Sequence, residues 1–154
     1  MTPAQASSVE RIGAALTQAG LARLPSRVFA ALLVDDDGRM TSAELAAALG
    51  VSPAGVSGGV AYLEQLGMLR RERVRGSRRD VYVVDDDAWH QAMMRHDQIY
   101  GPIKASFDHA ITALGDAAPA HHRLALTRDF LYFIEEELDD IATKWENRKA
   151  ELGY

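Results

Sequence analysis

Apolar residues recur three or four positions apart through most of the chain, the spacing that places them on one face of a helix. The first such stretch covers residues 4–19, and Gly20 follows it as a helix stop. Its apolar face consists of Val9, Ile12 and Leu16. A second helix is predicted around Pro25 and ends at the turn of residues 35–38. One short helix cannot bury its apolar stripe alone, so we expect the first helix to dock on another element.

Two short helices joined by a tight turn are predicted in the middle of the chain. Thr41 and Glu44 have the Thr-x-x-Glu form of a capping box, which satisfies unpaired amides at a helix start. This helix should end at Gly50. Ser52 and Pro53 begin the next helix almost at once, as a strong N-cap residue followed by proline. Such close spacing forces a sharp angle between the helices, as in a helix-turn-helix.

After Gly67 the pattern changes from helical spacing to an extended run rich in arginine. Leu69 and Val74 stand among arginines, residues 75–78 form a turn, and residues 81–84 are a β-branched and aromatic return strand. The stretch of residues 69–79 contains six arginines and one glutamate. The arginines are Arg70, Arg71, Arg73, Arg75, Arg78 and Arg79. The pattern predicts a β-hairpin with apolar anchors at its base and arginines toward its tip.

Two long helices are predicted after the acids of residues 85–87, which suit the positive end of a helix dipole. Apolar and aromatic residues from Trp89 to Leu114 keep helical spacing, and Gly101-Pro102 should kink this helix or split it in two. The last helix runs to about Leu152. Its apolar stripe includes Leu131, Ile134, Leu138, Ile141 and Trp145. The small domain cannot cover such long apolar faces, so we expect the chain to self-associate through them.

The charge is unevenly distributed along the 154 residues, whose formal net charge is -5. Residues 20–84 carry nine arginines against seven acidic residues, whereas residues 85–154 carry seven basic and fourteen acidic residues. A DNA phosphate responds to charge within about 10 Å at ordinary salt, and not to the molecular total. The sequence therefore predicts one small basic feature on an acidic protein.

Several classes of protein are excluded by what the sequence lacks. The absence of cysteine excludes a disulfide scaffold, a thiolate zinc site and a thiol redox switch. The N-terminus lacks the basic and apolar regions of a signal peptide, and no apolar run approaches the roughly 20 residues that span a bilayer. We therefore expect a cytoplasmic protein with no membrane contact.

No cofactor, metal site or catalytic site is predicted. The histidines and acids that could bind a metal are His90, His96, Asp97 and His109. On a helix these residues lie too far apart to share one ion. No phosphate-binding glycine loop, His-Glu-x-x-His or Gly-x-Ser-x-Gly motif is present, so we expect no enzyme activity.

A helix-turn-helix places the N-terminal part of its second helix nearest the base edges in the DNA major groove. The predicted contact residues there are Ser52, Ala54, Ser57, Gly58 and Tyr62. None is Arg, Lys, Asn or Gln, the side chains that read guanine or adenine with two hydrogen bonds. This helix should therefore contribute shape fit, and the six arginines of the hairpin should contribute much of the affinity. Arg75 and Arg78, at the tip, are suited to the narrow minor groove.

Residues 25–84 resemble the winged helix-turn-helix of the MarR family of bacterial transcriptional regulators. The segments MTSAELAAALGVSPAGVSGGVAYLEQLGMLRRERV and GSRRDVYVVDDDAW are most similar to its GbsR-like branch. Many family members carry Asp-x-Arg in the wing, where this chain has Arg-Gly-Ser-Arg-Arg-Asp. This difference leaves open which arginine enters the minor groove and whether Asp80 orients it.

The resemblance implies a homodimer, held by the first and last helices, that binds a near-palindromic operator. The dimer residues would be Val9, Ile12, Leu16, Leu131, Ile134, Leu138, Ile141 and Trp145. The resemblance also implies a small-molecule effector between the DNA-binding and dimerisation parts. Trp89, Met93, His96 and Tyr100 are the candidate effector residues, and the alternative is that they belong to the core.

These observations together predict a mainly α-helical fold with a small β-hairpin wing. We expect an N-terminal dimerisation helix over residues 1–20, a winged helix-turn-helix over 21–85 and a C-terminal helical dimerisation region over 86–154. The predicted function is sequence-specific DNA binding as a homodimeric repressor, released by an effector. The alternative is a helical protein–protein adaptor whose winged helix no longer binds DNA, an interpretation that the neutral recognition helix favours.

Overall fold

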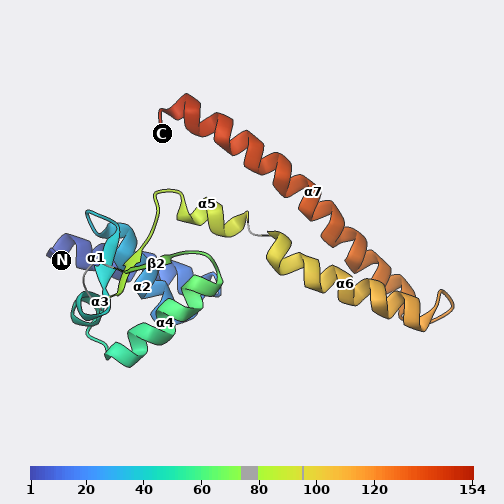
Figure 1. Cartoon of the computed structure of the whole chain (residues 1–154), viewed down its shortest axis with the longest axis horizontal. Helices are drawn as coiled ribbons and strands as arrows, with labels where there is room; N and C mark the ends of the chain where they lie inside the picture. The colour runs from blue at the N-terminus through green and yellow to red at the C-terminus, as the bar shows by residue number, and fades with distance from the viewer. Residues whose placement is uncertain (74–79, 95) are drawn as a thin grey trace. The chain divides into compact units, whose positions relative to one another are not determined.

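The computed structural model (Figure 1) describes the backbone of residues 1–73, 80–94 and 96–154, and the side chains in these ranges except those of residues 96–99. The chain divides into two units, Met1–Ala92 and Met93–Tyr154. The helices are α1 (Pro3–Gln18), α2 (Arg23–Val34), α3 (Ser42–Leu49), α4 (Pro53–Gln65), α5 (Ala88–Met93), α6 (His96–Leu114) and α7 (His121–Leu152). The strands are β1 (Arg39–Thr41), β2 (Arg70–Arg73) and β3 (Asp80–Val83).

The helix-turn-helix forms where the capping residues predicted it. Thr41 accepts a hydrogen bond from the Glu44 amide, and the Glu44 carboxylate accepts one in return from the Thr41 amide, which completes the capping box. Gly50 ends α3 in the left-handed conformation, with φ +66°. The hydroxyl oxygen of Ser52 accepts from the Gly55 amide at 3.2 Å and begins α4. The chain bends by 109° between α3 and α4.

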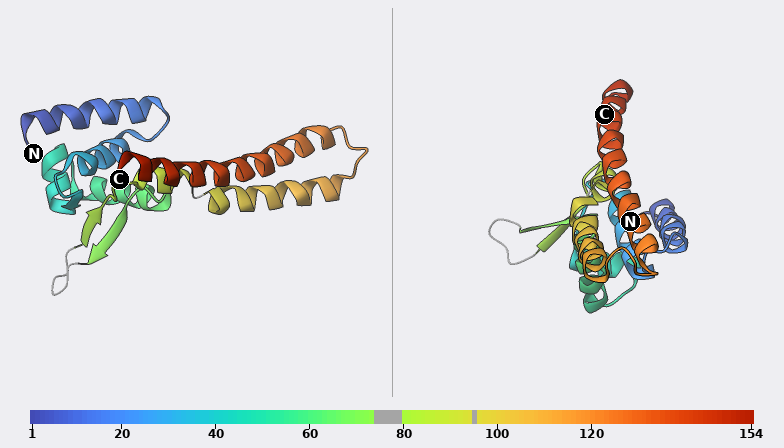
Figure 2. Two further views of the ribbon diagram at one scale, coloured as in Figure 1. Left: turned by 90° about the horizontal axis from the view of Figure 1, so that it is seen from above. Right: turned by 90° about the vertical axis from the view of Figure 1, so that its right-hand side faces the viewer.

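The predicted hairpin is part of a three-stranded antiparallel sheet in the order β1-β3-β2. Its two long strands are confirmed, and they extend away from the helices of the N-terminal unit (Figure 2). The third strand, β1, was not predicted from the sequence. It pairs Arg39 with Val83 and Thr41 with Val81. The predicted turn at residues 75–78 lies outside the described residues.

The hydrophobic core of the N-terminal unit is centred on α2. Phe29 and Leu32 of α2 are fully buried, and they pack with the inward side chains of the other helices. These are Val9, Leu45, Val56, Val60 and Leu63. Since Val9 is already buried within its own chain, it has no surface to offer a partner, unlike the half-buried Ile12 and Leu16. The expectation that the first helix docks on another element is therefore confirmed, and that element is α2.

The predicted break in the first long helix lies in a different place. The helical segment ends with α5 at Met93 and resumes with α6 at His96, whereas Pro102 lies inside α6. A split at Gly101-Pro102 is therefore wrong. Since the amide of a helical residue bonds the carbonyl four residues earlier, Pro102 removes one bond near the start of a 19-residue helix.

The C-terminal unit is an antiparallel pair in which α6 and α7 lie side by side (Figures 1 and 2). Lys104 is the one buried side chain among its described residues, and it is a charged one. The Lys104 ammonium pairs with Glu135 and lies 4.5 Å from the centre of the Tyr132 ring. Large apolar side chains of α7 remain exposed, among them Leu126, Phe130, Phe133 and Ile141. This unit therefore lacks a hydrophobic core of its own in the part that the structure describes.

No single helix in the described ranges is both long and apolar enough to cross a membrane. Taken together, α3 and α4 form the one bent pair in those ranges that reaches such a length and composition.

Candidate nucleic-acid interface

The outward face of α4 is made of uncharged side chains, most of them small. Val56, Val60 and Leu63 are fully buried, which turns the opposite side of the helix toward solvent. The exposed residues are Ser52, Pro53, Ala54, Ser57, Gly58, Ala61, Tyr62 and Gln65. The predicted contact residues Ala54, Ser57, Gly58 and Tyr62 are therefore accessible together on one helix. The Ser52 hydroxyl oxygen already caps α4, so its remaining capacity is chiefly that of a donor.

Three glycines of α4 differ in their surroundings. A Cβ atom on Gly55 would lie 3.2 Å from Leu24 Cδ2, and one on Gly59 would lie 3.4 Å from Val28 Cγ2. These two glycines let α4 approach α2 closely. A Cβ atom on Gly58 would meet nothing within 4 Å. Glycine inside a helix lowers stability by about 0.5–1 kcal/mol relative to alanine, so packing within the chain gives no reason for glycine at position 58.

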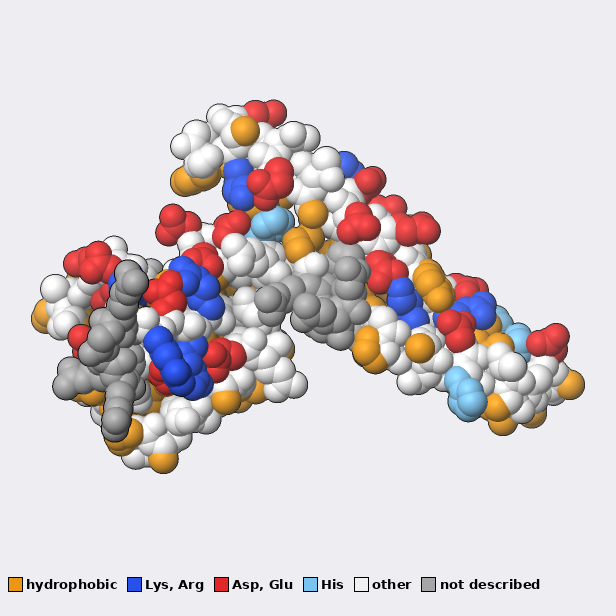
Figure 3. Space-filling view, viewed as in Figure 1, with side chains coloured by type: hydrophobic (Ala, Val, Ile, Leu, Met, Phe, Trp, Pro, Cys, Tyr) orange, Lys and Arg blue, Asp and Glu red, His pale blue; other side chains and the backbone are white. Residues whose placement is uncertain are grey.

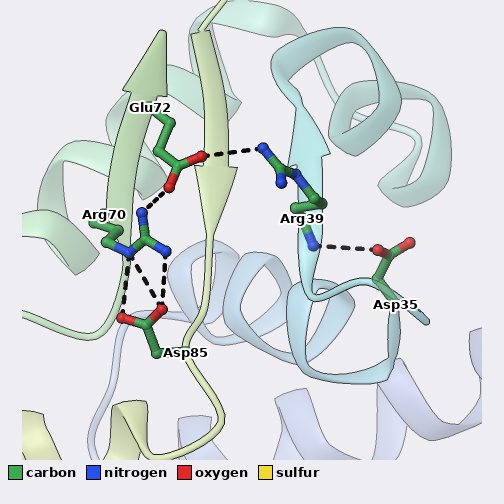
Figure 4. A network of polar contacts seen from close by, with 5 residues as sticks. All are labelled: Asp35, Arg39, Arg70, Glu72 and Asp85. Carbon is green, nitrogen blue, oxygen red and sulfur yellow. Dashed lines mark hydrogen bonds and ion pairs between the residues drawn. The ribbon is translucent and has the colours of Figure 1, made fainter. Parts of the chain in front are cut away.

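A network of ion pairs covers one face of the sheet (Figure 4). Arg70 of β2 binds both Asp85, at 3.0 Å, and Glu72. Glu72 also binds Arg39 of β1 at 3.0 Å, and the Arg39 amide donates to Asp35. These contacts cross the central strand β3, because Arg39 and Arg70 both stand opposite Val83 in the strand register. The network thereby ties both edge strands to one another.

Arg71 connects the wing to the recognition helix. Its guanidinium binds Glu64 of α4 at 3.0 Å and Asp80 of β3 at 3.4 Å, and it lies 5.6 Å from the centre of the Tyr82 ring. Partial burial lowers the pKa of Arg71, but the hydrogen bond and charge of Glu64, with the charges of Tyr82 and Asp80, raise that pKa above its usual value. Arg71 therefore stays charged and fixes the base of the wing against α4.

The six predicted DNA-binding arginines do not form one uncompensated basic patch. Arg70 and Arg71 are paired with carboxylates, and Arg73, whose side chain is 88% exposed, lies 3.9 Å from Asp80. Basic and acidic side chains accordingly lie next to one another on the N-terminal unit in Figure 3. Arg75, Arg78 and Arg79 lie outside the described residues. A DNA phosphate would have to compete with carboxylates for Arg70 and Arg71, and the contact of these arginines with DNA stays a prediction.

Two residues that the sequence did not single out share the exposed face of α4. Ala61 and Gln65 follow Ala54 and Gly58 at helical spacing, and Gln65 brings an amide of the kind that reads adenine. The sequence contained the signal for them, since positions three and four residues apart share a helix face. The predicted contacts ended at Tyr62, before Gln65, and did not include Ala61 although it lies within that range.

The candidate effector residues do not come together within one unit. Trp89 belongs to the N-terminal unit, where its half-exposed ring lies 6.2 Å from the ring of Phe29. Met93 and Tyr100 belong to the C-terminal unit, and the side chain of His96 lies outside the described residues. The effector pocket therefore stays a prediction.

A hollow of about 670 Å³ lies beside the acidic turn between α2 and β1. It is bordered by Gln5, Val34, Asp36, Met40 and Glu44, among others. The acids have structural partners: Asp36 accepts from Gln5, and Glu44 completes the capping box. These contacts fit the turn that was predicted at residues 35–38.

Comparison with known proteins gives matches over nearly the whole chain. The profile of the MarR family matches residues 19–80, and that of MmpR5-like MarR family transcriptional regulators matches residues 87–148. The HTH-type transcriptional regulator MmpR5 of Mycobacterium tuberculosis (strain ATCC 25618 / H37Rv) is 32% identical over 144 residues, which cover 93% of this chain and 87% of that protein. A transcriptional regulator of known crystal structure is 31% identical, with a TM-score of 0.84 over 94% of this chain and 99% of that one.

The ion pairs at the wing lead to a testable prediction about Glu72. Glu72→Gln removes the carboxylate that holds Arg39, so Arg39 becomes available to phosphate, whereas Arg70 keeps its pair with Asp85. We expect affinity for a random-sequence DNA duplex to rise about threefold and the slope of log K against log salt to steepen by about 0.9 for the released arginine. Fluorescence anisotropy at several salt concentrations measures both quantities.

Asp37→Asn is the matched control, because Asp37 is exposed and its side chain makes no hydrogen bond or ion pair among the described residues. An equal change in both variants would mean that only net charge matters, and would contradict the prediction.

Proposed function

The chain belongs to the MarR family of transcriptional regulators, and we propose that it acts as a homodimeric repressor on a near-palindromic operator. DNA binding and transcriptional regulation follow from the family. The dimer, the operator symmetry and the repressing action are the proposal. The GbsR-like branch remains a prediction, since the family matches name an MmpR5-like group.

The apolar surface of the C-terminal unit is the main observation that supports the proposed dimer. Phe133 is 53% exposed, Phe130 is 57% exposed, and Leu126 continues the same face of α7 at helical spacing. Exposed aromatic side chains in such a row mark a surface that another protein covers. A second copy of the chain is the natural partner, because a two-fold dimer presents the same patch from both sides. In the N-terminal unit, Ile12 and Leu16 of α1 are half-buried, and we propose them as a separate dimer contact.

In the proposed complex, α4 enters the major groove of each half-site and the wing follows the adjacent minor groove. The small side chains of Ala54 and Gly58 allow a close approach to the DNA, while Ser57 and Gln65 supply hydrogen-bonding groups. Two recognition helices would then lie about 34 Å apart, one turn of DNA. Occupation of promoter DNA gives repression, and an effector would act by shifting the dimer to a spacing that the half-sites do not match.

DNA binding by the full-length protein is the first test of the proposal. We expect a dimer to bind a fragment of its own upstream DNA, selected in competition with random-sequence duplex, with affinity that falls steeply as salt rises. Arg75→Ala together with Arg78→Ala should abolish this binding, since both belong to the predicted wing tip. Binding would be measured by electrophoretic mobility shift with a salt titration. An empty result from both upstream DNA and a genome-wide selection would favour the adaptor function instead.

Gly58→Ala should separate folding from DNA binding. Because a Cβ at this position meets none of the described atoms within 4 Å, we expect the free energy of unfolding to rise by about 0.5–1 kcal/mol. The added methyl group would stand between α4 and the DNA, so operator affinity should fall about tenfold. Urea unfolding and anisotropy measure the two effects. Gly101→Ala in α6, where a Cβ also meets no described atom within 4 Å, is the control and should leave operator affinity unchanged. Unchanged operator affinity in Gly58→Ala would remove Gly58 from the interface.

Phe133→Glu should weaken the dimer, since it places a charge in the exposed apolar row of α7. We expect the dimer dissociation constant to rise about thirtyfold or more, as sedimentation velocity over a range of protein concentrations would show. Thr143→Glu adds the same charge at an exposed position of α7 outside that row and should have little effect. A Phe133→Glu protein that dimerises as tightly as the original would place the dimer surface elsewhere.

A further inference from the structure

Arg27 joins three helices of the N-terminal unit. It lies on α2, and its Nε and Nη2 atoms donate to Glu10 Oε1 of α1 at 3.0 and 2.6 Å. The same Nη2 atom donates to the main-chain oxygen of Leu49 at 3.2 Å. Leu49 is the last residue of α3, so one guanidinium connects α1 to the end of the first helix of the helix-turn-helix.

The Leu49 carbonyl is one of those that a helix end leaves without an intrahelical partner. The amides of Gly50 and Val51, which follow it, both donate to Ala46. Arg27 therefore supplies a donor where the helix itself has none. Ser52, the N-cap of α4, follows directly, so Arg27 acts on the turn that sets the DNA-reading end of α4.

The stem of Arg27 is fixed as firmly as its guanidinium. Gly13 of α1 is buried against it, and a Cβ atom on Gly13 would lie 3.1 Å from Arg27 Cγ and 3.4 Å from its Cα. The side chain is 23% exposed, so packing and hydrogen bonds together hold it in one position. A displacement of α1 relative to α2 would change the geometry at both acceptors.

We propose that Arg27 is a positioning residue for DNA binding: it ties α1 to the turn between α3 and α4, and thereby sets the start of the recognition helix without contacting DNA. The inference rests on the proposed function, in which α4 reads the operator and α1 belongs to the dimer surface. It adds a structural connection, the hydrogen bonds of Arg27, through which a movement of α1 would shift the start of α4. A change in the dimer that moves α1 would then alter operator affinity through Arg27.

Glu10→Ala gives a test in which two explanations predict opposite changes in operator affinity. Glu10 is 60% exposed, so the variant should fold normally. Removal of an acidic charge alone would strengthen binding to a polyanion. If Arg27 needs its anchor on α1, operator affinity should instead fall about threefold. The probes are the fragment selected from upstream DNA and a random-sequence duplex. Asp37→Ala, which removes an exposed carboxylate without a side-chain partner among the described residues, is the control.

Arg27→Met keeps the apolar stem and removes all three hydrogen bonds of the guanidinium. We expect operator affinity to fall about tenfold while the salt slope stays unchanged, because no phosphate contact is lost. Hydrogen exchange gives a readout without DNA: the Gly50 and Val51 amides should exchange about tenfold faster than in the original protein. Arg23→Gln, which removes an exposed cation of α2 with no ion pair in the described residues, should change neither quantity.

Three results would overturn the inference. One is a Glu10→Ala protein that binds the operator as tightly as the original or more tightly. Another is a decrease of about 0.9 in the salt slope of Arg27→Met, which would make Arg27 itself a phosphate contact. The third is unchanged exchange at Gly50 and Val51. Failure of the original protein to bind any DNA would instead refute the proposed function, so the two failures are distinguishable.

Discussion

The burial of α2 is the constraint on which the rest of the N-terminal unit depends. Phe29 and Leu32 lose all contact with water, and every other helix of the helix-turn-helix packs on the same core. Fully burying a large apolar side chain contributes about 1.5–3 kcal/mol. The backbone of α4 approaches α2 closely at Gly55 and Gly59, so the outward face of α4 is fixed by what its inward face contacts. The proposed DNA-reading surface is thus a consequence of core packing.

The electrostatics of the wing differ from what an arginine count suggests. Each described arginine of the sheet lies near at least one carboxylate. Arg70 binds Asp85, which follows β3, and Arg71 binds Glu64 of α4 and Asp80 of β3. Exposed ion pairs contribute only about 0–1 kcal/mol each to stability. In the proposed DNA complex, a phosphate would compete with a carboxylate already in place. Such competition would favour a well-fitted operator over the general attraction of any polyanion.

The sequence predicted local features well and non-local ones poorly. The capping box at Thr41, the left-handed Gly50 and the N-cap Ser52 depend on neighbouring residues, and all three are confirmed. Strand β1 has three residues, too few for an alternating pattern, and it exists only because β3 pairs with it. The ion pair between Arg70 and Asp85 joins residues fifteen positions apart, so it could not be predicted from neighbouring residues and is known only from the folded structure. The exposure of Ala54, Ser57, Gly58 and Tyr62 on α4 agrees with their prediction as contact residues, but their contact with DNA stays a prediction.

The buried Lys104 of the C-terminal unit has a consequence for how folding depends on protein concentration. A pair of helices whose one described buried side chain is a charged lysine, held by Glu135, draws little stability from its own interior. Under the proposed dimer, the missing apolar burial is supplied by a second chain, so assembly and folding of this unit become one equilibrium. The fraction of native protein would then rise with the number of copies in the cell, as mass action requires. In such a regulator, the concentration of native dimer would fall more steeply than the total concentration of the protein when its synthesis declines.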